Sequence, residues 1–143
     1  QMGCYIFVRF IMFLLNDKDK FSAYSMTKCV DYSMFGEEAL NAYARLLKDD
    51  ITKYKLKDIN STSYIVDTLE ATIWISLKSE NYKEAIIGAI NLGGDTSTIG
   101  ALTGAACGII YGYDQIPEQW LAQIARREYL MDIFEEFSEN KYQ

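Results

Sequence analysis

The chain has 143 residues, of which 50% are hydrophobic and 24% charged, and its formal net charge is −6. This length suits one domain with a sizeable core, and the acidic balance argues against nonspecific binding to nucleic acid or to an anionic membrane. The absence of histidine from the sequence excludes histidine-based activation of a nucleophile and the usual zinc sites. Any acid–base or metal chemistry must therefore use carboxylates, hydroxyl groups and the backbone.

Three cysteines, Cys4, Cys29 and Cys107, are scattered along the chain without a paired spacing. Such a set is typical of reduced, buried thiols in an intracellular protein, and we expect a cytoplasmic location. The apolar stretch at 3–15 is too short to span a membrane and lacks the flanks of a signal peptide. We expect a buried helix there.

Apolar residues recur at spacings of three and four residues along most of the chain, which predicts helices. After a polar connector at 16–20, a second helix is expected to end at Phe35 and Gly36. A third has Glu37 and Glu38 in its first turn, where the helix dipole favours anions. Residues 48–60 are polar and rich in lysine and aspartate, so we expect a surface loop that includes the pair at 49–50.

The helical spacing continues in the second half of the chain. A cluster of capping residues at 61–63 precedes a helix in which Asp67 and Glu70 are expected to be solvated or to cap. Asn81 is expected to begin the next helix. The helix predicted at 96–111 carries glycines at four-residue intervals, which favours close helix contact along one side and a centrally buried position; these glycines are Gly100, Gly104, Gly108 and Gly112.

Pro117 stands where a further helix would begin, and apolar spacing continues as far as Phe137, before a polar tail at 138–143. The chain has no β-hairpin signal. We therefore expect residues 1–143 to form a single all-α domain of about six to eight helices, given usual helix lengths.

The sequence at 93–98 is the strongest candidate for a site. Gly93 and Gly94 allow a sharp turn, and Asp95, Ser97 and Thr98 then place a carboxylate and two hydroxyl groups at the start of a helix. Hard cations bind such oxygens, and helix N-termini favour anions such as phosphates. The alternative is purely structural: the glycines form a turn, and Asp95 or Thr96 caps the helix.

Several longer stretches add to this motif. They are residues 64–71, 82–85, 91–101, the steps at Gly104 and Gly108, and residues 111–112 and 116–121. In order and spacing this set resembles the C-terminal part of the ADP-ribosylglycohydrolase family. The resemblance covers 61–125, while 1–60 resemble the middle helices of the family only weakly.

The resemblance implies an all-α helical bundle with two Mg²⁺ (or Mn²⁺) ions in a central cleft. The ions and nearby carboxylates act on the ribose C1″ bond to a modified protein side chain or a small-molecule acceptor. The C-terminal metal motif of the family is Gly-Gly-Asp-Thr-Asp-Thr, so Asp95 and Thr98 match metal ligands and Ser97 replaces the second aspartate. Serine is a neutral and weaker donor, and the site loses one negative charge. Gly93, Gly94 and Thr96 are expected to bind the ADP-ribose.

The family's other metal ligands lie in an N-terminal half with a Thr-Asp-Asp motif, which this sequence does not contain. The resemblance therefore implies a C-terminal half, truncated on its N-terminal side, with half of a binuclear site. No catalytic residue is assigned, and we expect the chain alone to be inactive. Three hypotheses follow: a hydrolase completed by a complementary N-terminal half, an ADP-ribose-binding module without turnover, and a structural fragment that forms a homodimer through its apolar first helix.

Overall fold

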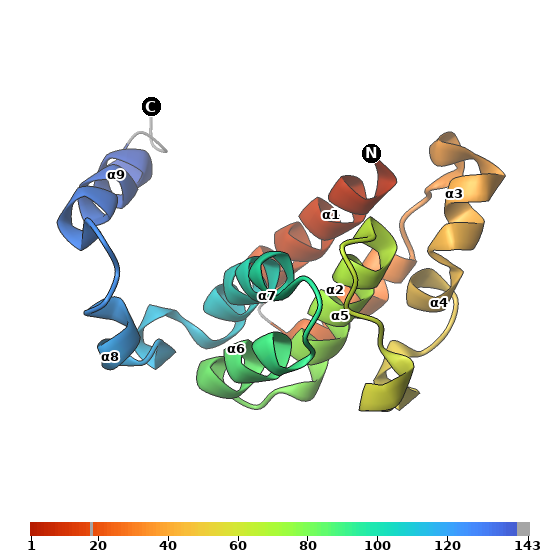
Figure 1. The fold of residues 1–143 in the computed structure, drawn as a ribbon. Helices are drawn as coiled ribbons and strands as arrows, with labels where there is room; N and C mark the ends of the chain where they lie inside the picture. Colours follow the sequence, from red (N-terminus) through yellow and green to blue (C-terminus); the bar gives the residue numbers. More distant parts are fainter. Residues whose placement is uncertain (18, 140–143) are drawn as a thin grey trace.

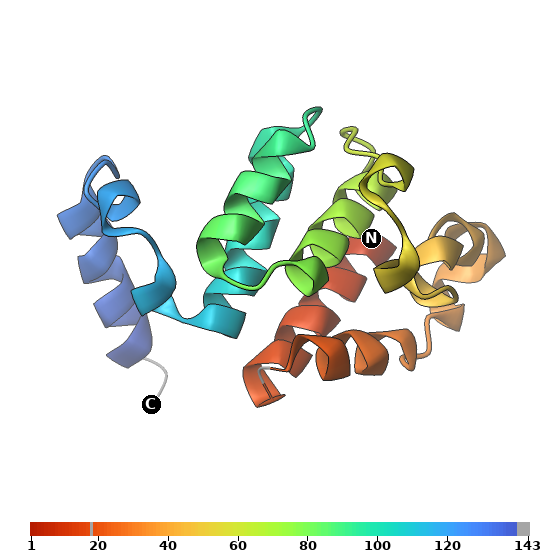
Figure 2. The same cartoon turned by 90° about the horizontal axis from the view of Figure 1, so that it is seen from below.

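The computed structural model describes residues 1–17 and 19–139, and within these ranges every regular element is helical. Figures 1 and 2 show a body of packed helices and an arm, formed by the last two helices, that extends away from it. The all-α expectation is confirmed. The α-helices are α1 (Met2–Asp17), α2 (Lys20–Lys28), α3 (Gly36–Ala42), α4 (Ala44–Leu47), α5 (Ile65–Lys78), α6 (Tyr82–Asn91), α7 (Thr96–Tyr111), α8 (Glu118–Leu121) and α9 (Arg127–Glu139).

Four short 3₁₀ helices lie between the α-helices of the described residues: η1 (Ser33–Phe35), η2 (Ile51–Lys53), η3 (Leu56–Asp58) and η4 (Tyr113–Gln115). The expected count of helices was too low because two predicted helices are interrupted. The third breaks at Tyr43, whose buried ring packs against Gly3 of α1. The last breaks between α8 and α9, where Arg126 has a φ of 56°.

The centre of the body is α5, which buries all ten residues from Thr68 to Leu77. Two of its buried hydroxyl groups are satisfied within the helix: the Thr72 hydroxyl donates to the Thr68 carbonyl and the Ser76 hydroxyl to the Thr72 carbonyl, each at 2.8 Å. The expectation that the glycine-rich helix α7 is centrally buried is wrong. It buries four residues, Ile99, Thr103, Ala106 and Cys107, and packs on α5 and α6 along one side.

Close contact along the glycines of α7 is confirmed at one position. A Cβ at Gly104 would lie 3.3 Å from the Tyr82 hydroxyl of α6, whereas a Cβ at Gly108 would meet nothing within 4 Å. Gly112 lies beyond the helix and caps it with a φ of 88°. Close packing therefore accounts for Gly104 and helix termination for Gly112, while no contact in the described structure requires glycine at position 108.

Helix α1 is partly buried. Ile6, Phe10 and Leu14 are fully buried, while Val8, Met12 and Leu15 are about half exposed. The expectation of a buried helix thus holds for one face only. No helix among the described residues is long and apolar enough to cross a membrane.

Three further expectations need correction. The second helix ends at Lys28, capped by Cys29, well before Phe35. Residues 48–60 are not a plain surface loop, because Ile51 is fully buried and the Trp74 indole donates to the Tyr54 carbonyl at 3.1 Å. Of the cysteines, only Cys107 is buried, while Cys4 and Cys29 are exposed.

In the connector at 16–20, Asp19 caps α2 and residue 18 lies outside the described residues. The expected polar tail begins inside α9, and its residues 140–143 also lie outside the described part of the chain.

Candidate functional site

The turn between α6 and α7 has the geometry that its glycines predict. Gly93 and Gly94 have φ values of 74° and 61°, a region that residues with a Cβ rarely adopt. Asp95 follows as the N-cap of α7, and its carboxylate accepts a hydrogen bond from the Thr98 backbone at 3.3 Å. Of the two candidate caps, the structure therefore selects Asp95, and Thr96 is the first residue of the helix.

This turn is fixed to the segment that precedes α5. The Asp95 backbone N–H donates to the Ser61 carbonyl at 2.8 Å, and the Ser61 hydroxyl donates to the Leu92 carbonyl at 3.0 Å. A Cβ at Gly94 would lie 2.0 Å from the Ser61 carbonyl oxygen. Position 94 therefore requires glycine for two separate reasons, its φ and this close approach.

The predicted metal ligands lie together at the start of α7. The Ser97 hydroxyl donates to Asp95 Oδ1 at 3.2 Å, and both Ser97 and Thr98 are exposed. Hydrogen bonds from the Thr98 side chain and backbone lower the pKa of Asp95 below its usual value, so this carboxylate is ionised at neutral pH. The turn therefore presents one negative charge and two accessible hydroxyl groups.

These donors are of the class that Mg²⁺ prefers, but they are few. Among residues 1–17 and 19–139, no three histidine, cysteine or acidic side chains gather in a way that suits a metal ion. Asp95, Ser97 and Thr98 fit one side of a hydrated Mg²⁺ ion. They do not fit a complete two-ion site, for which further carboxylates are needed.

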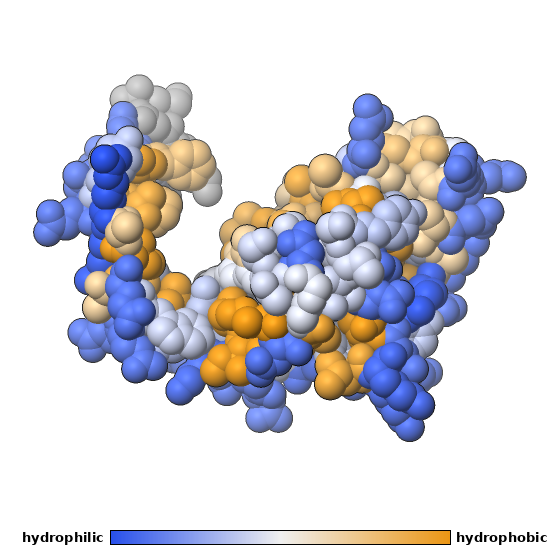
Figure 3. All heavy atoms as spheres, viewed as in Figure 1, coloured by the Kyte–Doolittle hydropathy of each residue, from blue (hydrophilic) through white to orange (hydrophobic). Residues whose placement is uncertain are grey.

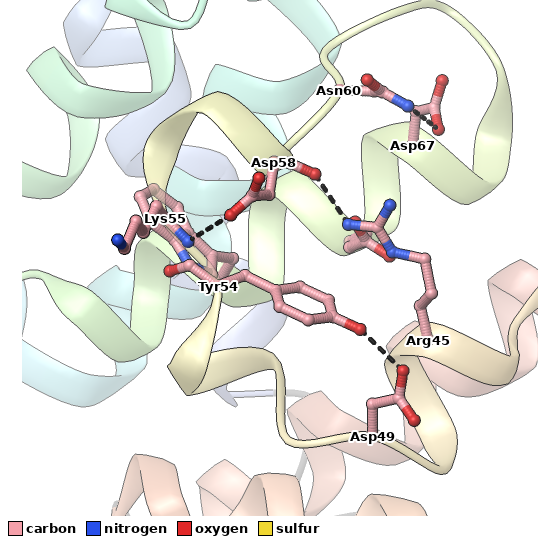
Figure 4. A network of polar contacts seen from close by, with 9 residues as sticks. Arg45, Asp49, Tyr54, Lys55, Asp58, Asn60 and Asp67 are labelled. Atoms are coloured by element: carbon pink, nitrogen blue, oxygen red, sulfur yellow. Dashed lines mark hydrogen bonds and ion pairs between the residues drawn. The ribbon is translucent and has the colours of Figure 1, made fainter.

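Asp67 holds the loop beside the turn. Its carboxylate accepts from the Thr62 hydroxyl at 2.6 Å and from the Asn60 side chain at 3.4 Å, the latter drawn in Figure 4. The Thr68 hydroxyl donates to the Thr62 carbonyl at 3.1 Å. These bonds fix residues 60–62 to the start of α5, where Asp67 is partly exposed in the first turn, while the N-cap of the helix is Tyr64.

The expectation that Glu70 is solvated or capping is wrong. Its side chain is 7% exposed and forms an ion pair with Arg45 at 2.9 Å. Burial raises the pKa of Glu70, and the Arg45 charge partly offsets this. The sequence carried a signal for burial that our interpretation missed, since Glu70 lies four residues after Val66 and three before Ile73, on the apolar face of the helix.

Arg45 links this buried carboxylate to the chain that leads to the site. Its guanidinium donates to the Asp58 carbonyl at 2.7 Å and lies over the Tyr54 ring, 4.7 Å from the centroid. The Tyr54 hydroxyl in turn donates to Asp49 at 2.6 Å (Figure 4). Segment 45–58 is therefore held over α5, and Ser61, three residues further on, is placed beside the glycine turn.

The sequence of this chain is similar to those of known proteins. The ADP-ribosylglycohydrolase family model matches residues 1–143. An ADP-ribosylarginine hydrolase of Serratia proteamaculans is 34% identical over 105 residues, which are 71% of this chain and 29% of that protein. An ADP-ribosyl-[dinitrogen reductase] glycohydrolase of Rhodospirillum rubrum is 39% identical over 64 residues, 45% of this chain and 22% of that protein.

The chain thus spans less than a third of the length of these relatives. The match nevertheless covers the whole sequence, including the glycine turn and both ends of the described structure. The resemblance that the sequence motifs indicated is confirmed: this chain belongs to the ADP-ribosylglycohydrolase family.

Proposed function

We propose that the chain provides one side of a metal and ADP-ribose site that hydrolyses an ADP-ribosyl bond, on a modified protein or a small molecule. The observation that carries this proposal is the rigid placement of Asp95, Ser97 and Thr98 at the start of α7, on a turn bonded to Ser61. Two family relatives are named as hydrolases of ADP-ribosylated arginine and dinitrogen reductase, which favours a modified protein as substrate.

Asp95, Ser97 and Thr98 would hold the Mg²⁺ (or Mn²⁺). The bound ion supplies Lewis-acid polarisation of substrate oxygens. Mg²⁺ gives up its waters reluctantly, so a site with one carboxylate holds it weakly. The second ion and the remaining carboxylates would come from the part of the family fold that this chain does not span, and the chain alone would have little or no turnover.

The residues of the turn favour a phosphate-bearing ligand. The free N–H groups at the start of α7 attract anions, and Gly93 has no side chain to block a close approach. This arrangement suits the pyrophosphate of ADP-ribose. The scattered thiols favour a reducing compartment, and we place the protein in the cytoplasm.

The test combines the chain with the segment of the Serratia hydrolase that lies outside its 105 matched residues. Release of ADP-ribose from ADP-ribosylarginine is measured with and without Mg²⁺. We expect Mg²⁺-dependent release that Asp95→Asn abolishes. Asp114→Asn is the matched control, because Asp114 lies in η4, away from the turn. Equal activity of the two variants, or no release from a complex that does form, would contradict the proposal.

A second candidate function is ADP-ribose binding without hydrolysis. The replacement of the family's second aspartate by Ser97 favours it, because the site then has one charge fewer for the metal. Binding of ADP-ribose to the combined segments without any release from a modified acceptor would select this alternative.

A further inference from the structure

A pocket between α1 and the end of α2, which we call the α1–α2 pocket, combines charged and apolar side chains. Apolar atoms are exposed at several places on the body and on the arm (Figure 3), so apolar exposure alone does not mark a ligand site. The α1–α2 pocket has a volume of about 420 Å³, within the usual size of a small-molecule site. Figure 2 shows α2 at the opposite end of the body from the turn between α6 and α7. The pocket is therefore separate from the candidate metal site.

Arg9 of α1 brings to this pocket a positive charge that has no partner in the described part of the chain. Its Nε atom is buried without a hydrogen-bond acceptor, and the ion pairs among residues 1–17 and 19–139 do not include Arg9. The guanidinium lies over the Phe13 ring, with Cζ 5.0 Å from the centroid, a contact that leaves its N–H groups unused. Because buried N–H groups nearly always have an acceptor, and guanidinium groups favour carboxylates, Arg9 suits the carboxylate of a ligand.

Asp31, just after α2, brings a negative charge to the same pocket. Its Oδ1 atom accepts a hydrogen bond from the Ser33 backbone N–H at 2.9 Å. This bond lowers the pKa of Asp31 below its usual value, so the carboxylate is ionised at neutral pH. In the described structure Asp31 does not pair with Arg9, although both line the pocket. The pocket therefore offers separate places to an anionic and a cationic group of one ligand.

Apolar side chains form much of the remaining wall. They are Phe13, Met26 and Val30, and Met26 is 45% exposed. A ligand that covers these side chains removes apolar surface from water, which favours binding. A small ion without a hydrocarbon part would leave this surface exposed, and a plain hydrocarbon would leave the Arg9 guanidinium without a partner. The pocket therefore suits a ligand that joins two opposite charges to an apolar group.

We propose that the α1–α2 pocket binds a free α-amino acid with an apolar side chain. The carboxylate of the amino acid accepts hydrogen bonds from the Arg9 guanidinium, and its ammonium group donates to the Asp31 carboxylate. Its side chain covers Met26 and Val30. A ligand with a carboxylate alone meets the like charge of Asp31, and an amine alone meets that of Arg9, and such juxtapositions weaken binding.

The first test is isothermal titration of the full chain with leucine, for which we expect a dissociation constant of about 1 mM or lower. Three analogues each lack one of the groups that the pocket recognises. They are 4-methylpentanoate, without the ammonium group, 3-methylbutylamine, without the carboxylate, and glycine, without the side chain. We expect each analogue to bind about tenfold or more weakly than leucine.

Two variants then assign the charges. Arg9→Gln should weaken the binding of leucine and of 4-methylpentanoate about tenfold or more, and leave that of 3-methylbutylamine unweakened. Asp31→Asn should weaken leucine and 3-methylbutylamine instead. Arg127→Gln and Asp132→Asn are the matched controls, because both residues are exposed in α9. A general loss of structure would weaken all three ligands together, and circular dichroism would detect it.

The thiol of Cys29 gives a second readout in the unaltered chain, which covers the case in which a variant fails to fold. Cys29 lines the α1–α2 pocket and Cys4 does not, while both are exposed. With leucine at about ten times its dissociation constant, we expect alkylation of Cys29 to slow about tenfold. Alkylation of Cys4 should keep its rate.

Any one of four results would overturn the proposal. The first is no binding of leucine at about 10 mM, and the second is equal affinity for leucine and its analogues. The third is equal affinity of the Arg9→Gln and Arg127→Gln variants for leucine, and the fourth is an unchanged rate of Cys29 alkylation. None of these readouts needs metal, ADP-ribose or hydrolysis, so they test the α1–α2 pocket independently of the proposed function.

Discussion

Replacing Gly94 with alanine tests how tightly the site turn is constrained. The φ of 61° costs a residue with a Cβ about 1–2 kcal/mol. The added Cβ would lie 2.0 Å from the Ser61 carbonyl oxygen, so the two segments must separate. Separation stretches the 2.8 Å hydrogen bond from the Asp95 N–H to that oxygen, a loss of about 0.5–1.5 kcal/mol. We expect Gly94→Ala to lower the free energy of unfolding by about 2–3 kcal/mol.

Two matched variants separate the contributions. Gly93 has a φ of 74° but open space around a built Cβ, so Gly93→Ala should cost only the backbone strain of about 1–2 kcal/mol. Gly108 lies inside α7 with nothing within 4 Å, and Gly108→Ala should stabilise the helix by up to about 1 kcal/mol. The assay is urea unfolding followed by circular dichroism. If Gly94→Ala cost no more than Gly93→Ala, the close approach of Ser61 would play no part in the constraint.

Three further predictions concern the residues around this turn. Arg45→Ala removes the partner of the buried Glu70, and because Arg45 is 46% exposed we expect a loss of about 1–2 kcal/mol in the free energy of unfolding. Lys53→Ala, at an ion pair that is mostly exposed, should change the free energy of unfolding by less than about 0.5 kcal/mol. Equal effects of the two variants in urea unfolding would count against a stabilising role of the Arg45–Glu70 ion pair. Burial raises the pKa of Glu70 above its ordinary value of 4.5, so its contribution to stability is present below pH 4.5 and is lost as the pH rises through the folded pKa. Glu70→Gln should therefore flatten this part of the pH–stability curve. An unchanged slope would refute the raised pKa of Glu70 as its cause. Ser97→Asp adds the charge that the site lacks, and titration calorimetry of the chain should show Mg²⁺ binding strengthened by about tenfold or more; unchanged affinity would mean that position 97 does not face the ion.

Features that depend on neighbouring residues could be predicted from the sequence. Asn81 and Asp95 are helix caps in the structure because their side chains accept hydrogen bonds from N–H groups three residues ahead. The glycine turn has positive φ values for the same local reason. The helical spacing of apolar residues likewise located α5 and α6, and the small residues after the glycine turn located α7; the packing of these three helices on one another shapes the site.

Features that depend on distant residues could not be predicted. Arg45 and Glu70 meet across two 3₁₀ helices and a loop, and no periodicity pairs residues so far apart in the sequence. The close contact of Ser61 with Gly94 joins segments on either side of α5 and α6. The exposure of Cys4 depends in turn on which face of α1 the rest of the chain covers, and a helix that is apolar all round carries no signal for that choice.

The central claim is that Asp95, Ser97 and Thr98 form one side of a working metal and ADP-ribose site. Isothermal titration of the purified chain with ADP-ribose, with and without about a tenfold excess of Mg²⁺, tests it most directly, since the excess drives a weak site by mass action. The account predicts weak binding that Mg²⁺ strengthens and that Asp95→Asn removes. No binding in either condition, at millimolar ADP-ribose, would mean that Asp95 only caps α7.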